Sequence, residues 1–139
     1  IQELYDSGIR AVLSVNKGDG VEPRALRRLG ISYQRTTLPV NTPPTVKDLK
    51  TSLKLLPRAY RFVADQIDQD RPVLVHCRHG NDRTGVFLAY YLCRRHGFAP
   101  DDAIEEVRSR RAACLRANGW QRFTKELLNQ VCANENLTG

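Results

Sequence analysis

Residues 73–87 read VLVHCRHGNDRTGVF, and this stretch determines how the rest of the chain must be arranged. It begins with a continuous apolar run, which is typical of a strand that is covered on both faces. An apolar helix pattern then runs from Thr84 to His96 and ends before Gly97. Cys77 therefore stands at the carboxyl end of a strand, where open α/β sheets bind their ligands.

The flanking sequence alternates between strand and helix patterns. Strand patterns precede the central stretch at residues 9–15 and 31–40, and helix patterns lie at residues 22–30 and 46–69. Pro57 interrupts the longer helix pattern, so we expect a kink or two consecutive helices there. This alternation predicts an α/β fold with a mostly parallel central sheet flanked by helices.

Only helix patterns follow His96. Asp101 or Asp102 is expected to cap the first of them, and an apolar stripe from Trp120 to Val131 marks the last. The chain has 139 residues, 41% of them hydrophobic, which fits a single domain over residues 1–139. Because it lacks an initiating Met and opens inside a helix pattern, we expect its N-terminus to be truncated.

The composition also narrows the function classes. No apolar stretch approaches the roughly 20 residues of a membrane span, so we expect no transmembrane segment. The four cysteines form no C-x-x-C pair, which favours a reducing, cytoplasmic setting without a metal site. The net charge of +7 favours anionic ligands. Its basic residues are scattered, however, so we expect no nucleic-acid partner.

The loop at residues 78–83 has the sequence features of an anion-binding site. A tight turn before a helix N-terminus points successive backbone N–H groups inward and adds the positive end of the helix dipole. Gly80 permits the close backbone approach, and Arg83 offers a planar fork suited to two phosphate oxygens. Facing these groups, Cys77 is expected to be a thiolate at neutral pH.

Three neighbours support this loop in the predicted arrangement. The Thr84 hydroxyl can donate a hydrogen bond to the thiolate, Gly85 lets the helix start pack tightly, and His76 orients the loop from beneath. Lys17 follows the first strand at the same edge of the sheet. It is either an ordinary turn lysine or a contact for anionic substrate.

The stretch HCRHGNDRTG resembles the signature of cysteine-dependent protein tyrosine phosphatases, and within them the small dual-specificity branch. The resemblance extends to LYDSGIRAVLSV, to ISYQRTTLPV and to AIEEVRSRRAACLRANGWQRF, and so covers most of the chain. It implies phosphate ester hydrolysis through a phosphocysteine at Cys77, with no metal or other cofactor. It also implies a phosphate-binding loop made of Arg78, His79, Gly80, Asn81, Asp82 and Arg83.

The residue that would act as general acid, by giving a proton to the leaving oxygen, is harder to identify from the sequence. The family usually carries an Asp on the loop after the strand ending LPV, but this sequence has Asn41 near that place, and Asn cannot supply the proton. Asp48 is the nearest carboxylate, yet its spacing from Thr45 is that of a helix capping box. Some members that act on phosphoinositides or have mixed specificity carry an Asp at the position of Asp82. We therefore favour Asp82 and keep Asp48 as the alternative.

The expected substrate is a phosphorylated protein, with phosphotyrosine or mixed specificity. Arg78 and His79 are expected at the rim of the pocket, where their positive potential would also suit a phosphoinositide or inositol phosphate. The alternative is that they are ordinary solvated residues that do not contact substrate. A third possibility is a catalytically silent module that binds phospho-groups, which the absence of an acid after LPV would favour.

Overall fold

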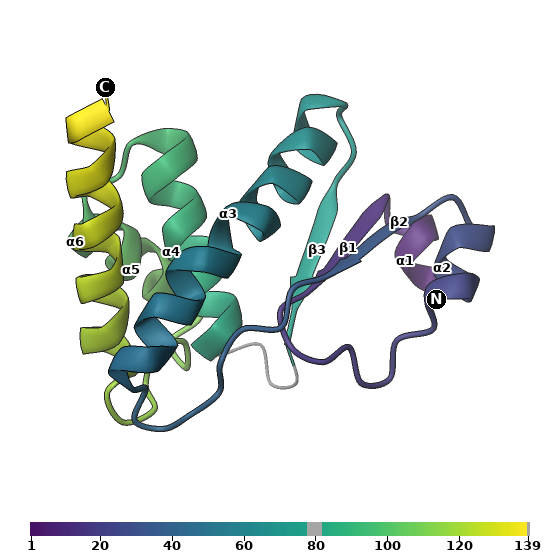
Figure 1. Ribbon diagram of the computed structural model, residues 1–139. Coiled ribbons are helices and arrows are strands. Elements are labelled where there is room, and N and C mark those ends of the chain that lie inside the picture. The colour runs from purple at the N-terminus through teal and green to yellow at the C-terminus, as the bar shows by residue number, and fades with distance from the viewer. Residues whose placement is uncertain (78–81, 139) are drawn as a thin grey trace.

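The computed structural model describes residues 1–77 and 82–138, with side chains as far as Cys132. Along the chain the elements are α1 (Gln2–Asp6), β1 (Ala11–Ser14), α2 (Pro23–Arg28), β2 (Ser32–Arg35), α3 (Val46–Asp68), β3 (Val73–His76), α4 (Asp82–His96), α5 (Pro100–Arg110) and α6 (Trp120–Thr138). The helices form two groups on opposite sides of a small sheet (Figure 1). The predicted α/β class is confirmed.

The sheet is parallel throughout, in the order β2-β1-β3. Ala11 of β1 is opposite Ser32 on one side and Val73 on the other, so all three strands end at one edge. The expected strand at residues 31–40 is shorter as an element, because β2 ends at Arg35. Backbone bonds to β1 nevertheless continue as far as Leu38, whose N–H donates to the Val15 carbonyl at 3.0 Å.

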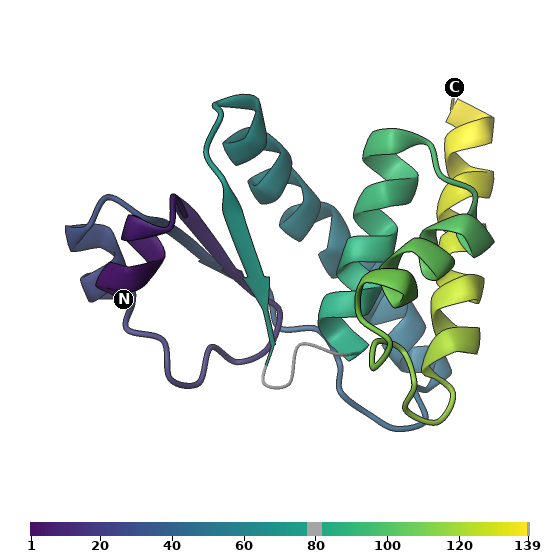
Figure 2. The same ribbon diagram turned by 180° about the vertical axis from the view of Figure 1, so that it is seen from behind.

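Alternation along β1 sends successive side chains to two cores. Val12 packs with Leu26 and Ile31 in a small cluster beneath α1 and α2. Leu13 and Val15 point to the opposite face and join the main cluster, which is covered by α3 to α6. Figure 2 shows the two helix groups from behind, with the sheet between them. All four residues of β1 are buried, as expected for a strand covered on both faces.

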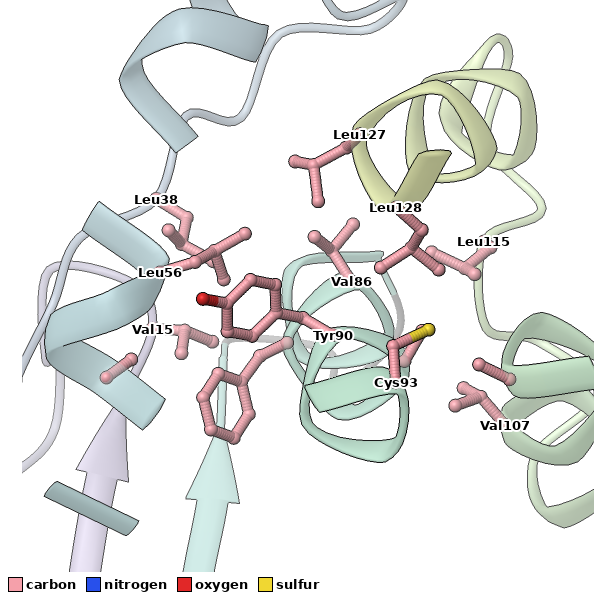
Figure 3. Close-up of a cluster of buried hydrophobic side chains, with 14 of the residues drawn as sticks. Val15, Leu38, Leu56, Val86, Tyr90, Cys93, Val107, Leu115, Leu127 and Leu128 are labelled. Carbon is pink, nitrogen blue, oxygen red and sulfur yellow. The ribbon is translucent and has the colours of Figure 1, made fainter. Parts of the chain in front are cut away.

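Helix α4 is the centre of the main core. Val86, Tyr90 and Cys93 project from it toward its neighbours (Figure 3). They meet Leu56 of α3 and Leu128 of α6, among others. The predicted apolar stripe of the last helix is also buried; its members are Trp120, Phe123, Leu127, Leu128 and Val131. Both helix predictions are confirmed.

Two expectations at helix ends and breaks are wrong, namely the alternative of two consecutive helices at Pro57 and an aspartate cap on α5. Helix α3 runs unbroken through Pro57 from residue 46 to residue 68, so there are not two consecutive helices. Its buried face, which includes Leu56 and Val63, holds it against the core on both sides of the proline. Neither Asp101 nor Asp102 caps α5, because Pro100 already occupies the first helical position and Ala99 is the N-cap.

Within the described residues, no helix is both long enough and apolar enough to cross a membrane.

Candidate active site

Cys77 and Thr84 meet at the edge where the strands end. Cys77 follows β3 directly and is 9% exposed, while Thr84 lies in the first turn of α4 and is also buried. The Thr84 Oγ1 hydroxyl donates a hydrogen bond to Cys77 Sγ over 3.0 Å. A donor in that position stabilises negative charge on the sulfur, both before it attacks and when it leaves.

His76 stands at the end of a hydrogen-bond relay that runs from β2 through β1. Tyr33 of β2 donates its hydroxyl to Ser14 Oγ over 2.8 Å, and Ser14 Oγ lies 2.6 Å from His76 Nε2. Since Ser14 accepts from Tyr33, its own hydrogen is available for Nε2, which favours a neutral His76 protonated on Nδ1. Burial lowers the pKa of His76, which also favours the neutral ring.

Sequence analysis did not find Ser14 and Tyr33. A serine at the end of a strand and a tyrosine in another carry no signal of their own, because only the register of the sheet brings them together. In the structure Ser14 is fully buried.

Asp82 opens α4 and points toward the segment that precedes α6. Its carboxylate accepts hydrogen bonds from the backbone N–H groups of Ala117 and Leu115. Burial raises the pKa of Asp82, although these bonds and the neighbouring Arg83 charge act to lower it. One carboxylate oxygen, Oδ1, is buried and has no hydrogen-bond partner within the described part of the chain.

The segment that holds Asp82 is packed tightly on the start of α4. Leu115 is 1% exposed and adopts a φ of 61°, which a leucine rarely does. A Cβ placed on Gly85 would lie 3.1 Å from Leu115 Cγ, so glycine permits this close approach. Leu115 carries no sequence signal for this conformation, because only the packing of α4 against residues 111–119 requires it.

Asp48 has a structural environment. It forms the predicted capping box with Thr45 at the start of α3, with both reciprocal hydrogen bonds present. The Asn41 side-chain amide also donates to both Asp48 oxygens, at 3.1 and 3.0 Å. Burial alone would raise the pKa of Asp48, but the bonds from Thr45 and Asn41 outweigh it and leave the pKa below its ordinary value.

The remaining candidates are placed as follows. Lys17 is exposed just beyond β1, and its carbonyl accepts a hydrogen bond from Arg35. Arg83 is half-buried in the first turn of α4. Within the described residues no cluster of His, Cys, Asp or Glu could hold a metal ion. Four candidates of the loop lie outside the described residues, namely Arg78, His79, Gly80 and Asn81.

Solved structures share this fold, PTPMT1 and Tk-PTP among them. PTPMT1 in complex with PI(5)P has a TM-score of 0.76 at 19% identity, covering 96% of this chain and 85% of that one. Tk-PTP in its active form has a TM-score of 0.74 at 20% identity, covering 92% and 85%. At this level of identity the likeness shows the fold alone, and it places the chain in the fold class of protein tyrosine phosphatases.

Sequence comparison then gives the family. The family model described as "Polymorphic toxin system, DSP-PTPase phosphatase" matches residues 1–97. The chain belongs to this dual-specificity and protein tyrosine phosphatase family, whose chemistry is cysteine-based.

Two curated relatives illustrate the likeness. The RNA/RNP complex-1-interacting phosphatase of Bos taurus is 34% identical over 63% of this chain, a match that spans 29% of the bovine protein. The human phosphatidylglycerophosphatase and protein-tyrosine phosphatase 1 is 25% identical over 99% of this chain and 68% of its own length.

Proposed function

We propose that this chain hydrolyses phosphate monoesters of proteins, with protein tyrosine or dual specificity, through a phosphocysteine on Cys77. The observation that carries the proposal is the buried pair of Cys77 Sγ and Thr84 Oγ1, 3.0 Å apart between the end of β3 and the start of α4. Arg83 in the same helical turn supplies the cation that a bound phosphate needs. Family membership supports the same chemistry.

The reaction has two steps. In the first, the Cys77 sulfur forms a bond to phosphorus while the bond from phosphorus to the leaving oxygen breaks, and that oxygen takes up a proton. In the second, water attacks the phosphocysteine, the phosphorus–sulfur bond breaks, and phosphate is released. Arg83 binds the phosphate oxygens in both steps, and the Thr84 hydroxyl stabilises the sulfur as it departs.

Asp82 is the proposed proton donor. Its raised pKa supports this role, because a protonated carboxyl is the form that a general acid needs. Asp48 is a weaker choice, since the donors from Thr45 and Asn41 favour its ionised form. The bonds from Leu115 and Ala117 to Asp82 also fit a purely structural carboxylate. Substitution of Asp82 by asparagine separates these two roles.

A phosphoinositide or another phospholipid headgroup is the second candidate substrate. The relative that matches almost the whole chain is named both a phosphatidylglycerophosphatase and a protein-tyrosine phosphatase. Either substrate would meet the same thiol and the same arginine.

All four cysteines are free, which supports a reducing compartment such as the cytoplasm as the place of action.

The test is hydrolysis of a phosphotyrosine peptide, a phosphothreonine peptide and a soluble phosphoinositide in the presence of a chelator, by the wild type and by Cys77→Ser. Hydrolysis that is lost in the variant supports the proposal, and the order of the substrates decides between protein and lipid. Binding of phosphopeptide without hydrolysis by the wild type would contradict it and indicate a module that only binds phospho-groups.

A further inference from the structure

A groove runs between the start of α3 and the segment that leads into α6. Its volume is about 750 Å³, within the range of roughly 300 to 1,000 Å³ that is usual for ligand sites. One wall is apolar and contains Pro43, Pro44 and Val46, and the other contains residues 115–119. The walls are fixed against each other, because a Cβ on Gly119 would lie only 2.8 Å from Pro43 Cβ.

Three arginines line this groove, namely Arg108, Arg116 and Arg122. Within the part of the chain that the structure describes, none of them forms a salt bridge. Arg108 donates to the neutral Gln121 side chain at 2.7 Å, and Arg116 donates to the Ala112 carbonyl. The carboxylate of Glu126 is also in the lining. The groove therefore carries an excess of positive charge that no protein carboxylate neutralises by contact.

The groove shares a wall with the candidate active site. Leu115 and Ala117 line it, and the backbone N–H groups of the same two residues donate to Asp82. Asp82 directly precedes Arg83 in the first turn of α4. Leu115 and Ala117 thus connect the groove to the first turn of α4, which also carries Arg83 and Thr84.

We propose that the groove binds an acidic segment of the polypeptide next to the phosphorylated residue of a protein substrate. The inference rests on the proposed phosphatase function and names its substrate class. A hollow with two walls encloses a chain that enters it, whereas a membrane is flat and is contacted by protruding side chains. The arginine side chains of the groove pair with the acidic residues of the substrate. The wall of Pro43, Pro44 and Val46 contacts the apolar parts of those acidic side chains and of the substrate residues next to them.

The experiment compares kcat/KM for two phosphotyrosine peptides of equal length, one with acidic and one with neutral residues beside the phosphotyrosine. The wild type is expected to prefer the acidic peptide, and 0.5 M salt should weaken that preference because the contacts are partly exposed. Arg116→Glu and Arg122→Glu should each reduce the ratio of the two values by about threefold to tenfold, as loss of one interfacial charge pair does.

Arg27→Glu is the matched control. Arg27 is exposed on α2, which lies across the sheet from α6 (Figure 1), and its substitution changes the net charge equally. It should leave the ratio unchanged. An equal loss in Arg27→Glu would show that only overall charge matters and would overturn the proposal. So would a wild type without preference between the peptides.

A binding measurement separates the groove from the chemistry. Fluorescence anisotropy with the Cys77→Ser protein gives the Kd of both peptides whether or not the wild type hydrolyses them. Tighter binding of the acidic peptide, weakened by Arg122→Glu, supports the groove even where the proposed hydrolysis fails. Equal binding of both peptides would overturn the proposal. Vesicles that contain an anionic phosphoinositide are the second probe. If the protein binds them, loses that binding in Arg122→Glu and binds both peptides equally, the groove is a lipid site and the proposal is overturned.

Discussion

The Ser14 hydroxyl lies 2.6 Å from Nε2 of His76, the residue that directly precedes Cys77. We expect Ser14→Ala to lower kcat/KM by about threefold to tenfold, the usual effect of one lost hydrogen bond. Without a donor to Nε2, and with less burial, His76 should also protonate at a higher pH. The acidic limb of the pH–rate profile should therefore shift to higher pH.

Tyr33→Phe tests the same relay from its far end. It removes the bond that orients Ser14, so a smaller change in the same direction is expected. A profile that keeps its shape and is only scaled down would show that Ser14 contributes packing rather than positioning of His76.

The hydrogen bond from Thr84 to Cys77 should matter most when the sulfur leaves. Thr84→Ala is expected to slow breakdown of the phosphocysteine by about a hundredfold, as loss of one well-placed donor does. Rapid-mixing experiments would then show a burst of leaving group followed by slow turnover. Thr84→Ser keeps the hydroxyl and should restore most of the rate. Slow turnover without a burst would instead place the effect on the first step.

Asp82→Asn distinguishes the acid from a structural carboxylate. As the proton donor, Asp82 should matter for poor leaving groups, so we expect about a 10²- to 10⁴-fold loss with an alkyl phosphate. With p-nitrophenyl phosphate, which needs no proton, the loss should be small. Equal losses with both substrates would indicate that Asp82 acts only by holding the Leu115 and Ala117 amides.

Asp48 is expected to contribute to stability. Asp48→Asn should lower the free energy of unfolding by about 1 kcal/mol at pH 7, because an amide NH2 replaces one of the carboxylate oxygens that accept from Asn41 and Thr45. Because folding lowers the pKa of Asp48 from about 3.8, its contribution is present above that pH and disappears as the pH falls below it. Urea unfolding at several pH values measures this, with Asp65→Asn, on the exposed side of α3, as the control.

Two glycines with similar backbone angles separate strain from packing. Gly119 has a φ of 83° and Gly30 a φ of 77°, but only Gly119 has a neighbour where its Cβ would be, Pro43 Cβ at 2.8 Å. Gly30→Ala should cost about 1 kcal/mol of stability through backbone strain alone. Gly119→Ala should cost about 1 to 3 kcal/mol more, because it overpacks the groove. Equal changes in Tm would argue against a tightly packed wall.

Much of the fold could be predicted because its signals are local. The apolar run before Cys77, the helix pattern after it and the capping box of Thr45 and Asp48 each depend on residues close in sequence. The alternative of two consecutive helices at Pro57 failed for the opposite reason, since Leu56 and Val63 of α3 are buried against distant parts of the chain and hold the helix together.

The sequence alone determined the class of fold, the place of Cys77 at the end of a strand and its helical neighbours Arg83 and Thr84. The tertiary structure decided which residues support them. Ser14 and Tyr33 reach His76 only through the parallel register of three strands, and Leu115 and Ala117 reach Asp82 only because residues 111–119 pack on α4. Contacts between residues so far apart depend on how the elements pack, which no local pattern records.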